Sequence, residues 1–172
     1  HYWRFNWYSQ PNSQVEFRNL TNDNKCVIKA QSYSNISDDR VKTNEKLIEN
    51  ATETLMKLRP QTYEQYGNMD CSGETHFQAG LIAQEVHYQA PELRDYVISY
   101  PHDISVNDIQ DIDIDDASIN IDPDYAALGW GKNETALNYI GFIPYLIKSN
   151  QEQQELIVNL QNRIAALENP SA

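Results

Sequence analysis

A serine and a lysine lie close together in one short polar segment, Ser37-Asp38-Asp39-Arg40-Val41-Lys42-Thr43-Asn44. A hydroxyl and an amine within hydrogen-bond reach can act as nucleophile and general base, the arrangement called a Ser–Lys dyad. Lysine is a base only in its neutral form, which requires burial beside apolar groups. Val41, Leu47 and the aromatic segments upstream are the candidates to supply that shield. The alternative is a solvated turn, because a Ser and a Lys five positions apart occur in many sequences.

The segments after this pair predict alternating short helices and strands. Residues 47–58 have apolar side chains at helical spacing, and Pro60 predicts the end of that helix. Thr62-Tyr63 is expected to open a strand, residues 64–76 a loop, and residues 81–86 a short helix or turn. These elements would position the Ser–Lys segment within a mixed α+β domain.

The segment before the pair predicts strands. Residues 2–7 alternate polar side chains with Trp3, Phe5 and Trp7, and residues 15–20 alternate likewise. Residues 26–30 form a further apolar run. Strands this few do not make an independent sheet, so their apolar faces are expected to pack on a partner. The chain opens without an initiator Met, which indicates a fragment of a longer protein.

An acidic stretch covers residues 101–125 and contains Asp111-Ile112-Asp113-Ile114-Asp115. A calcium-binding EF-hand loop requires Gly at its sixth position and Glu at its twelfth, but Asp116 and Asp122 stand there. The alternation of Ile and Asp therefore favours a strand with one apolar face.

Residues 138–168 carry a repeating apolar seam. Its positions alternate steps of three and four: Ile143, Leu146, Asn150, Gln153, Ile157, Leu160, Ile164 and Leu167. The flanking positions are polar, so the pattern predicts a coiled coil that self-associates. Ile at a with Leu at d favours two strands, although polar Asn150 and Gln153 weaken that rule. A helix packed on its own domain is the alternative.

Composition narrows the function classes. The net charge of −12 argues against a nucleic-acid partner, because an acidic chain repels phosphates. No apolar run approaches the roughly 20 residues of a membrane span. The two cysteines, Cys26 and Cys71, form no metal-ligand spacing, and we expect no metal or other cofactor.

Three motifs together resemble a known family, the C-terminal intramolecular chaperones of phage tail spikes and fibres. The first is the Ser37-to-Asn44 box, which feeds the apolar positions of 47–58. The second is Gly-Leu-Ile-Ala-Gln-Glu-Val at 80–86, followed by Pro-Glu-Leu at 91–93. The third is Asn-Tyr-Ile-Gly-Phe-Ile-Pro-Tyr-Leu-Ile at 138–147, just before the seam. The chain is similar to this endosialidase-type, self-cleaving family over residues 37–168.

The resemblance implies a single-turnover autoprotease that cuts the Ile36–Ser37 bond, with Ser37 as nucleophile and Lys42 as general base. Residues 1–36 would end an upstream β-helical stem, residues 37–137 would form the chaperone domain, and residues 138–172 a trimeric coiled coil. The module would trimerise, template the stem and then release itself. This would happen in the host cytoplasm during virion assembly, and the parent protein would stay in the virion as a tail fibre, spike or appendage.

Several alternatives stay open at this point. The residues of the seam favour a coiled coil of two helices, whereas the family is trimeric. The acidic stretch near 101–125 is longer than family members need between the second and third motifs. It forms either an acidic arm that grips the stem or a loop. Asp38, Arg40 and Asn44 are expected to be turn, cap and ion-pair residues, and Gln84 and Glu85 to serve helix packing and capping. Lys42 acts on Ser37 of its own chain or of another. A non-catalytic trimerisation cap is the competing function, and a membrane-tethered regulator ranks last.

Overall fold

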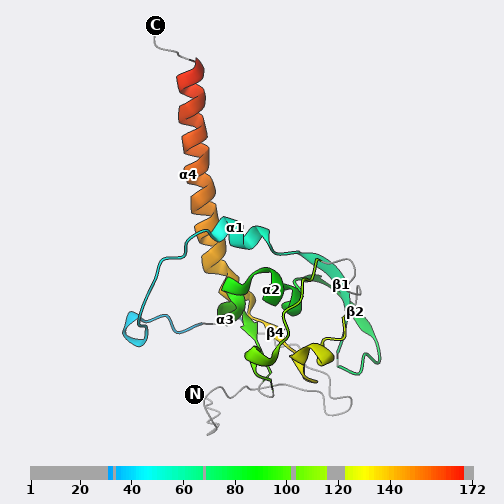
Figure 1. Ribbon diagram of the computed structural model, residues 1–172. Coiled ribbons are helices and arrows are strands. Elements are labelled where there is room, and N and C mark those ends of the chain that lie inside the picture. The colour runs from blue at the N-terminus through cyan, green and yellow to red at the C-terminus, as the bar shows by residue number, and fades with distance from the viewer. Residues whose placement is uncertain (1–30, 33, 68, 102–103, 116–122, 169–172) are drawn as a thin grey trace.

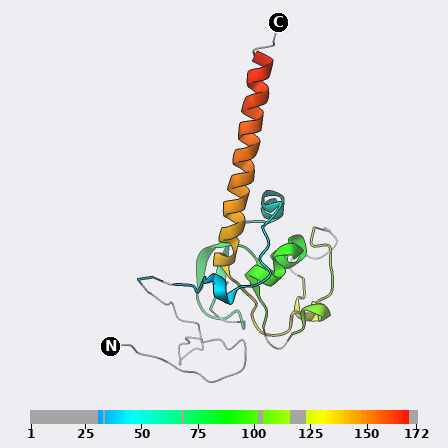
Figure 2. The ribbon, with the colours of Figure 1, turned by 90° about the vertical axis from the view of Figure 1, so that its left-hand side faces the viewer.

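The computed structural model describes residues 31–32, 34–67, 69–101, 104–115 and 123–168 (Figure 1). A long helix rises from a small body of short helices and two small sheets, which confirms the α+β class. Residues 34–50, here called the arm, extend to one side of the body in Figure 1, and Figure 2 views the molecule from that side. The strands predicted within residues 1–30 lie outside the described residues.

The described residues form the following helices and strands, given in chain order. They are η1 (Asp39–Val41), α1 (Ala51–Met56), β1 (Gln61–Tyr66), β2 (Thr75–Gly80), α2 (Ala83–Gln89), η2 (Pro91–Leu93), α3 (Arg94–Val97), β3 (Ile98–Ser99), η3 (Val106–Asp108), η4 (Ala126–Trp130), β4 (Ala136–Leu137), η5 (Tyr139–Phe142) and α4 (Ile143–Glu168). Within the described ranges, no helix is long and apolar enough to cross a bilayer.

Two antiparallel pairs make the sheets. Strand β1 pairs with β2 from Gln61 opposite Gly80 to Tyr66 opposite Thr75, which confirms the strand predicted at Thr62-Tyr63. Strand β3 pairs with β4 through Ile98 opposite Leu137. The connection between β1 and β2 is shorter than the loop predicted over 64–76, because both strands extend into it.

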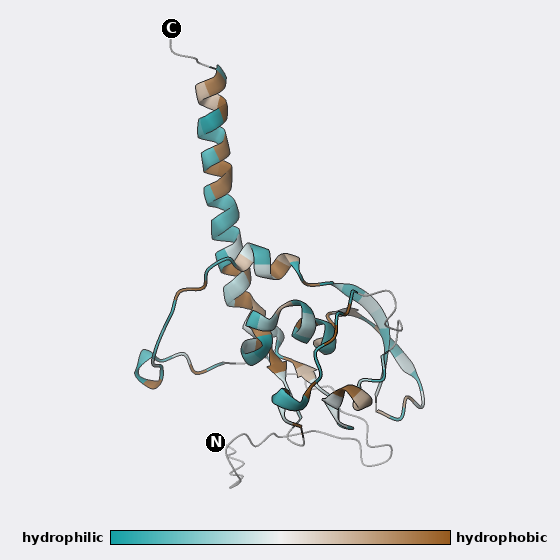
Figure 3. Cartoon of the chain, in the orientation of Figure 1, coloured by the Kyte–Doolittle hydropathy of each residue, from teal (hydrophilic) through white to brown (hydrophobic). Residues whose placement is uncertain are grey.

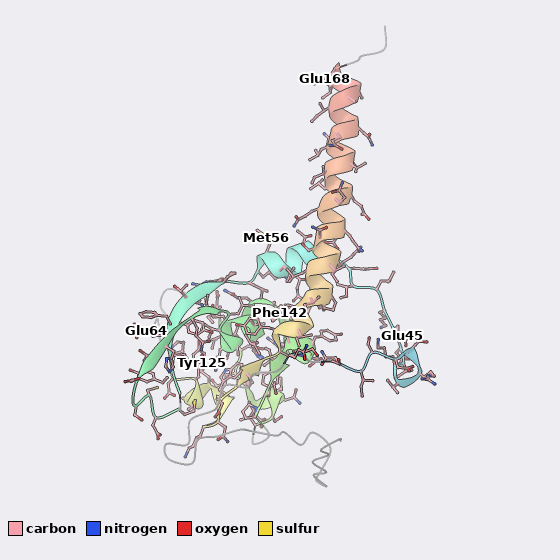
Figure 4. The ribbon with its side chains drawn as sticks, turned by 180° about the vertical axis from the view of Figure 1, so that it is seen from behind. Glu45, Met56, Glu64, Tyr125, Phe142 and Glu168 are labelled. Carbon is pink, nitrogen blue, oxygen red and sulfur yellow. The ribbon has the colours of Figure 1, made fainter. Side chains whose placement is uncertain are left out.

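The core joins elements from all three sequence motifs. Its buried residues come from α2 to β3 and from η5: Val86, Ala90, Leu93, Val97, Ile98 and Phe142. Leu55 and Leu58 from the first motif and Tyr145 from the third pack against this cluster. Figure 4 shows Phe142 at the base of α4, where the helix enters the body. The motifs therefore mark the residues that build one common core.

Two glycines of these motifs stand where no side chain fits. A Cβ on Gly80 would collide with the hydroxyl oxygen of Tyr139 from η5. That hydroxyl accepts a hydrogen bond from the backbone N–H of Leu81 at 2.9 Å, which ties the second motif to the third. A Cβ on Gly141 would lie 2.7 Å from the carbonyl oxygen of Tyr96. Both glycines thus allow close approach of neighbouring chain segments.

Two boundaries and one predicted strand differ from the sequence expectation. Helix α1 begins at Ala51 rather than at residue 47, because Asn50 adopts a left-handed conformation (φ 53°) that breaks the helix before it. Helix α4 begins at Ile143 rather than at 138, because the four residues of η5 form a tighter 3₁₀ turn first. Residues 111–115 form no strand, so that prediction was wrong. No neighbouring strand pairs with this run in the described ranges, and alternation alone does not make a strand.

A buried histidine stands at the centre of an aromatic cluster. His87 of α2 is 1% exposed, and its Nδ1 lies 2.7 Å from the hydroxyl of Tyr100. The indole of Trp130 packs edge-on against the imidazole and donates a hydrogen bond to the hydroxyl of Tyr88. Burial, together with the nearby positive charge of Arg94, lowers the pKa of His87 to about 4, and Asp111 opposes this shift.

This histidine predicts a loss of stability in mild acid. Its pKa in the folded chain, about 4, lies below the ordinary histidine value of 6.5, so the unfolded chain binds the proton first. The contribution is complete above pH 6.5 and is lost progressively as the pH falls towards 4. Between pH 7 and 4.5 we expect a loss of about 2–3 kcal/mol, measured by urea unfolding.

A matched pair of variants isolates this effect. His87→Gln is expected to be less stable than the wild type at neutral pH but to lack the histidine-dependent part of the acid loss. His76→Gln, at an exposed position of β2, is expected to keep the full acid loss. An acid loss of the same size in His87→Gln as in the wild type would assign it to other groups.

Candidate functional site

A single turn organises the polar segment at the start of the arm. The carboxylate of Asp38 accepts the backbone N–H of Arg40 at 2.9 Å and caps η1. The guanidinium of Arg40 closes on the same carboxylate through Nε at 3.0 Å and Nη2 at 2.6 Å. These hydrogen bonds lower the pKa of Asp38, and the bond from the side chain of Arg40 has the largest effect. Asp38 and Arg40 are therefore turn, cap and ion-pair residues, which confirms that interpretation.

The turn brings the lysine back onto the serine. The backbone N–H of Lys42 donates to the carbonyl of Asp39 at 3.0 Å and ends the turn. The Nζ atom of Lys42 then lies 2.9 Å from the hydroxyl oxygen of Ser37, and 3.3 Å from the carbonyl oxygen of Ser37. Both residues belong to the same chain. A hydroxyl and an amine at this distance can exchange a proton.

The pair is exposed in the single chain. Ser37 and Lys42 are exposed, Val41 is 71% exposed and Leu47 is 93% exposed. The expectation that Val41 and Leu47 shield the lysine is therefore wrong for the chain by itself. The physical reason is that the arm extends away from the core, as the position of Glu45 shows in Figure 4.

Left-handed residues shape the arm. Asn44 has φ 58° and Asn50 has φ 53°, a conformation that Asn tolerates better than most residues. Asn44, the last residue of the Ser37-to-Asn44 box, thus bends the chain just after the pair, which confirms it as a turn residue. Asn50 bends it again where the arm joins α1.

The arm is attached to the body through α1. The carboxylate of Glu152 on α4 accepts the backbone N–H groups of Ala51 at 3.1 Å and Thr52 at 2.8 Å. The hydroxyl of Thr52 also lies 3.0 Å from that of Ser149 on α4. These partners stand about a hundred positions apart, with separations of 101, 100 and 97. Sequence reasoning missed them because no local pattern links such distant residues.

Other polar side chains of the first two motifs hold elements together. Glu85 of α2 accepts a hydrogen bond from the side chain of Gln61 at 2.8 Å and lies 3.9 Å from the guanidinium of Arg59. Glu92 of η2 accepts a hydrogen bond from the hydroxyl of Thr54 at 3.1 Å. Glu85 thus serves packing, as expected, and none of these contacts reaches the Ser–Lys pair.

The seam of α4 is exposed along its length. Its apolar members are 43–79% exposed: Ile143, Leu146, Ile157, Leu160, Ile164 and Leu167. Figure 3 shows apolar and polar bands alternating along the helix beyond the body. Helix α1 covers the side that carries Ser149 and Glu152, which leaves the seam open.

Among the residues that the structure describes, no group of three or more His, Cys, Asp or Glu side chains is arranged to hold a metal ion. The acidic side chains of residues 111–115 do not gather into such a group.

The comparison with protein families agrees with the first two motifs, and the third, at 138–147, lies outside the matched residues. Residues 37–94 match the model of peptidase family S74, described as the chaperone of endosialidase. No curated protein and no solved structure matches the chain. The match begins at Ser37 and runs through η1, α1, the β1–β2 pair, α2 and η2 to Arg94. Over residues 37–94, this chain is therefore similar to the endosialidase-type chaperone domain.

Proposed function

We propose that this chain is an intramolecular chaperone that trimerises, templates the folding of a viral fibre or spike stem, and then releases itself by cutting its Ile36–Ser37 bond. The observation that carries the proposal is the 2.9 Å contact between Lys42 Nζ and Ser37 Oγ at the first residue of the family match. Ser37 is the nucleophile and Lys42 is the general base.

The position of the bond dictates the chemistry. Because Ser37 follows the bond that is cut, its hydroxyl attacks the carbonyl carbon of the residue directly before it. Lys42 takes the hydroxyl proton as the new C–O bond forms, and returns a proton to the Ser37 nitrogen as the C–N bond breaks. The product is an ester between the Ile36 acyl group and Ser37 Oγ. Water then hydrolyses the ester to a free Ile36 carboxylate and a chain that begins with Ser37.

This reaction happens once per chain, because the peptide bond that it consumes is the enzyme's own. An amine accepts a proton only in its neutral form, so we infer that the pair must be shielded from water before the bond is cut. Ile36, Val41 and Leu47 are 71–93% exposed around the pair. We expect assembly to cover these apolar side chains and thereby to exclude water from the pair.

In this proposal, cleavage follows the folding and assembly of the stem. Interdigitated stems fold slowly because their contacts join residues that are distant in sequence. A coiled coil that holds three chains in register raises their local concentration and therefore speeds the folding of the stem. Once the chaperone has left, the stem has lost its folding template and its stability becomes kinetic. We place these steps in the host cytoplasm during virion assembly, and the parent protein in the virion.

The test is the intact mass of the chain under denaturing conditions, made together with its native stem. The wild type is expected to split between Ile36 and Ser37, and Ser37→Ala is expected to stay whole. Ser37→Ala removes only the hydroxyl, so the turn closed by Asp38 and Arg40 is retained. A wild type that stays whole at neutral pH would overturn the autoprotease.

The exposure of the pair favours one second candidate, a trimerisation cap without catalysis. Ser37 and Lys42 are both exposed in the single chain, as a solvated turn would be. This candidate predicts an uncut trimer whose stem still depends on α4 for folding. The same mass measurement separates the two functions.

A further inference from the structure

The N-terminus of α1 is held by a residue far away in the chain. Both carboxylate oxygens of Glu152 are engaged, Oε1 by the N–H of Ala51 at 3.1 Å and Oε2 by the N–H of Thr52 at 2.8 Å. Around this contact, Ala51 is 0%, Thr54 4% and Ser149 6% exposed. The carboxylate therefore sits at a tightly packed junction of α1 with α4.

Helix α1 depends on this contact more than an ordinary helix would. It has six residues, too few to be stable alone in water. Asn50 precedes it in the left-handed conformation and makes no side-chain capping bond. The first N–H groups of a helix need acceptors, and an anionic acceptor also interacts favourably with the helix dipole. The hydrogen bonds from Thr52 and Ala51 lower the pKa of Glu152, so the carboxylate stays charged at neutral pH.

The contact lies between the reacting pair and the seam. The arm that carries Ser37 and Lys42 ends at Asn50, and the next residue is the first one that Glu152 binds. On α4, Glu152 stands next to Gln153 of the seam, while its own side chain faces α1. A shift of α1 on α4 would therefore move the whole arm relative to the axis about which the α4 helices assemble.

We propose that Glu152 is a positioning residue for self-cleavage, which fixes the arm relative to the α4 helices so that assembly brings the Ser–Lys pair to its covered position. This inference rests on the proposed autoprotease function. It assigns Glu152 no contact with the reacting atoms. Its role is to transmit the position of α4 to the arm through α1.

Three variants of the full chain with its stem test the role. Glu152→Ala removes both acceptors, and Glu152→Gln keeps one acceptor oxygen without the charge. Glu155→Ala is the matched control, because Glu155 is an exposed glutamate on the same helix. The rate is the appearance of the fragment that begins at Ser37, and the oligomeric state is measured by sedimentation. Amide exchange of residues 50–58 and 83–97 is followed in the uncut Ser37→Ala background.

We expect Glu152→Ala to cut roughly 10- to 100-fold more slowly than the wild type, because small misplacements of reacting groups cost rates of this order. The cleavage rate of Glu152→Gln is expected to lie between those of Glu152→Ala and the wild type, and Glu155→Ala is expected to cut at the wild-type rate. The variants should keep the wild-type oligomer and the slow exchange of residues 83–97, while residues 50–58 exchange faster without the carboxylate.

The outcomes distinguish a failed inference from a failed function. Cutting at the wild-type rate in Glu152→Ala would overturn the positioning role, although Ser37→Ala still stayed whole. Slower cutting that only followed a loss of oligomer, or faster exchange throughout 83–97, would overturn it as well, since Glu152 would then merely stabilise the fold. A wild type that never cuts would overturn the autoprotease itself, and the coupling with it.

Discussion

Lys42→Arg is expected to leave the chain whole under conditions in which the wild type cuts itself. Arginine keeps the positive charge and the reach to Ser37 Oγ, now 2.9 Å from Lys42 Nζ, so the turn is retained. Its guanidinium does not give up a proton in proteins and therefore fails as a base. Loss of a general base lowers a rate by about 10²–10⁴-fold, so we expect at least about a 100-fold fall in the cleavage rate. Intact mass over time measures it.

Lys46→Arg is the matched control for this variant. Lys46 lies four positions further along the arm and is exposed, so its replacement should leave the rate unchanged. Coexpression of Ser37→Ala with Lys42→Arg adds a second check. If the pair acts within one chain, every chain in the mixed assembly stays whole. Wild-type rates in Lys42→Arg would remove Lys42 from the mechanism.

The sequence predicted the local parts of this site. The Ser–Lys pair, the turn residues between them and the three motifs are all carried by short stretches of chain, in which the residue types themselves determine the geometry. Asp38 and Arg40 close their turn through contacts two positions apart. Such contacts need nothing from the rest of the fold, so a pattern of residues is enough to predict them.

What the sequence did not predict depends on contacts between distant residues. The exposure of Val41 and Leu47 follows from the direction of the arm, which the packing of α1 on α4 determines. The acceptor for the start of α1 comes from Glu152, and no local signal announces it. The run at 111–115 has the alternation of a strand but pairs with no strand in the described part of the chain, and alternation in a sequence does not reveal whether a partner strand lies beside it.

Ile157→Asp is expected to separate the chains of the assembly. Ile157 occupies the seam and is 48% exposed in the single chain, where no neighbour covers it. In the assembly each copy would bury an unpaired carboxylate beside identical ones, in addition to losing an apolar contact. We expect the association constant to fall at least about 100-fold, which corresponds to about 3 kcal/mol. Sedimentation over a concentration series measures it and also counts the strands.

Val158→Asp is the control that makes this result specific to the seam. Val158 is the next residue, is 45% exposed, and lies off the seam, so its replacement should leave the assembly intact. If assembly covers the arm and thereby frees the base, Ile157→Asp should also slow self-cleavage, whereas Val158→Asp should not. Dissociation by Val158→Asp alone would place the interface on another face of α4. Cleavage that continued at the wild-type rate in dissociated Ile157→Asp chains would mean that the exposed Ser37–Lys42 contact is already competent in a single chain.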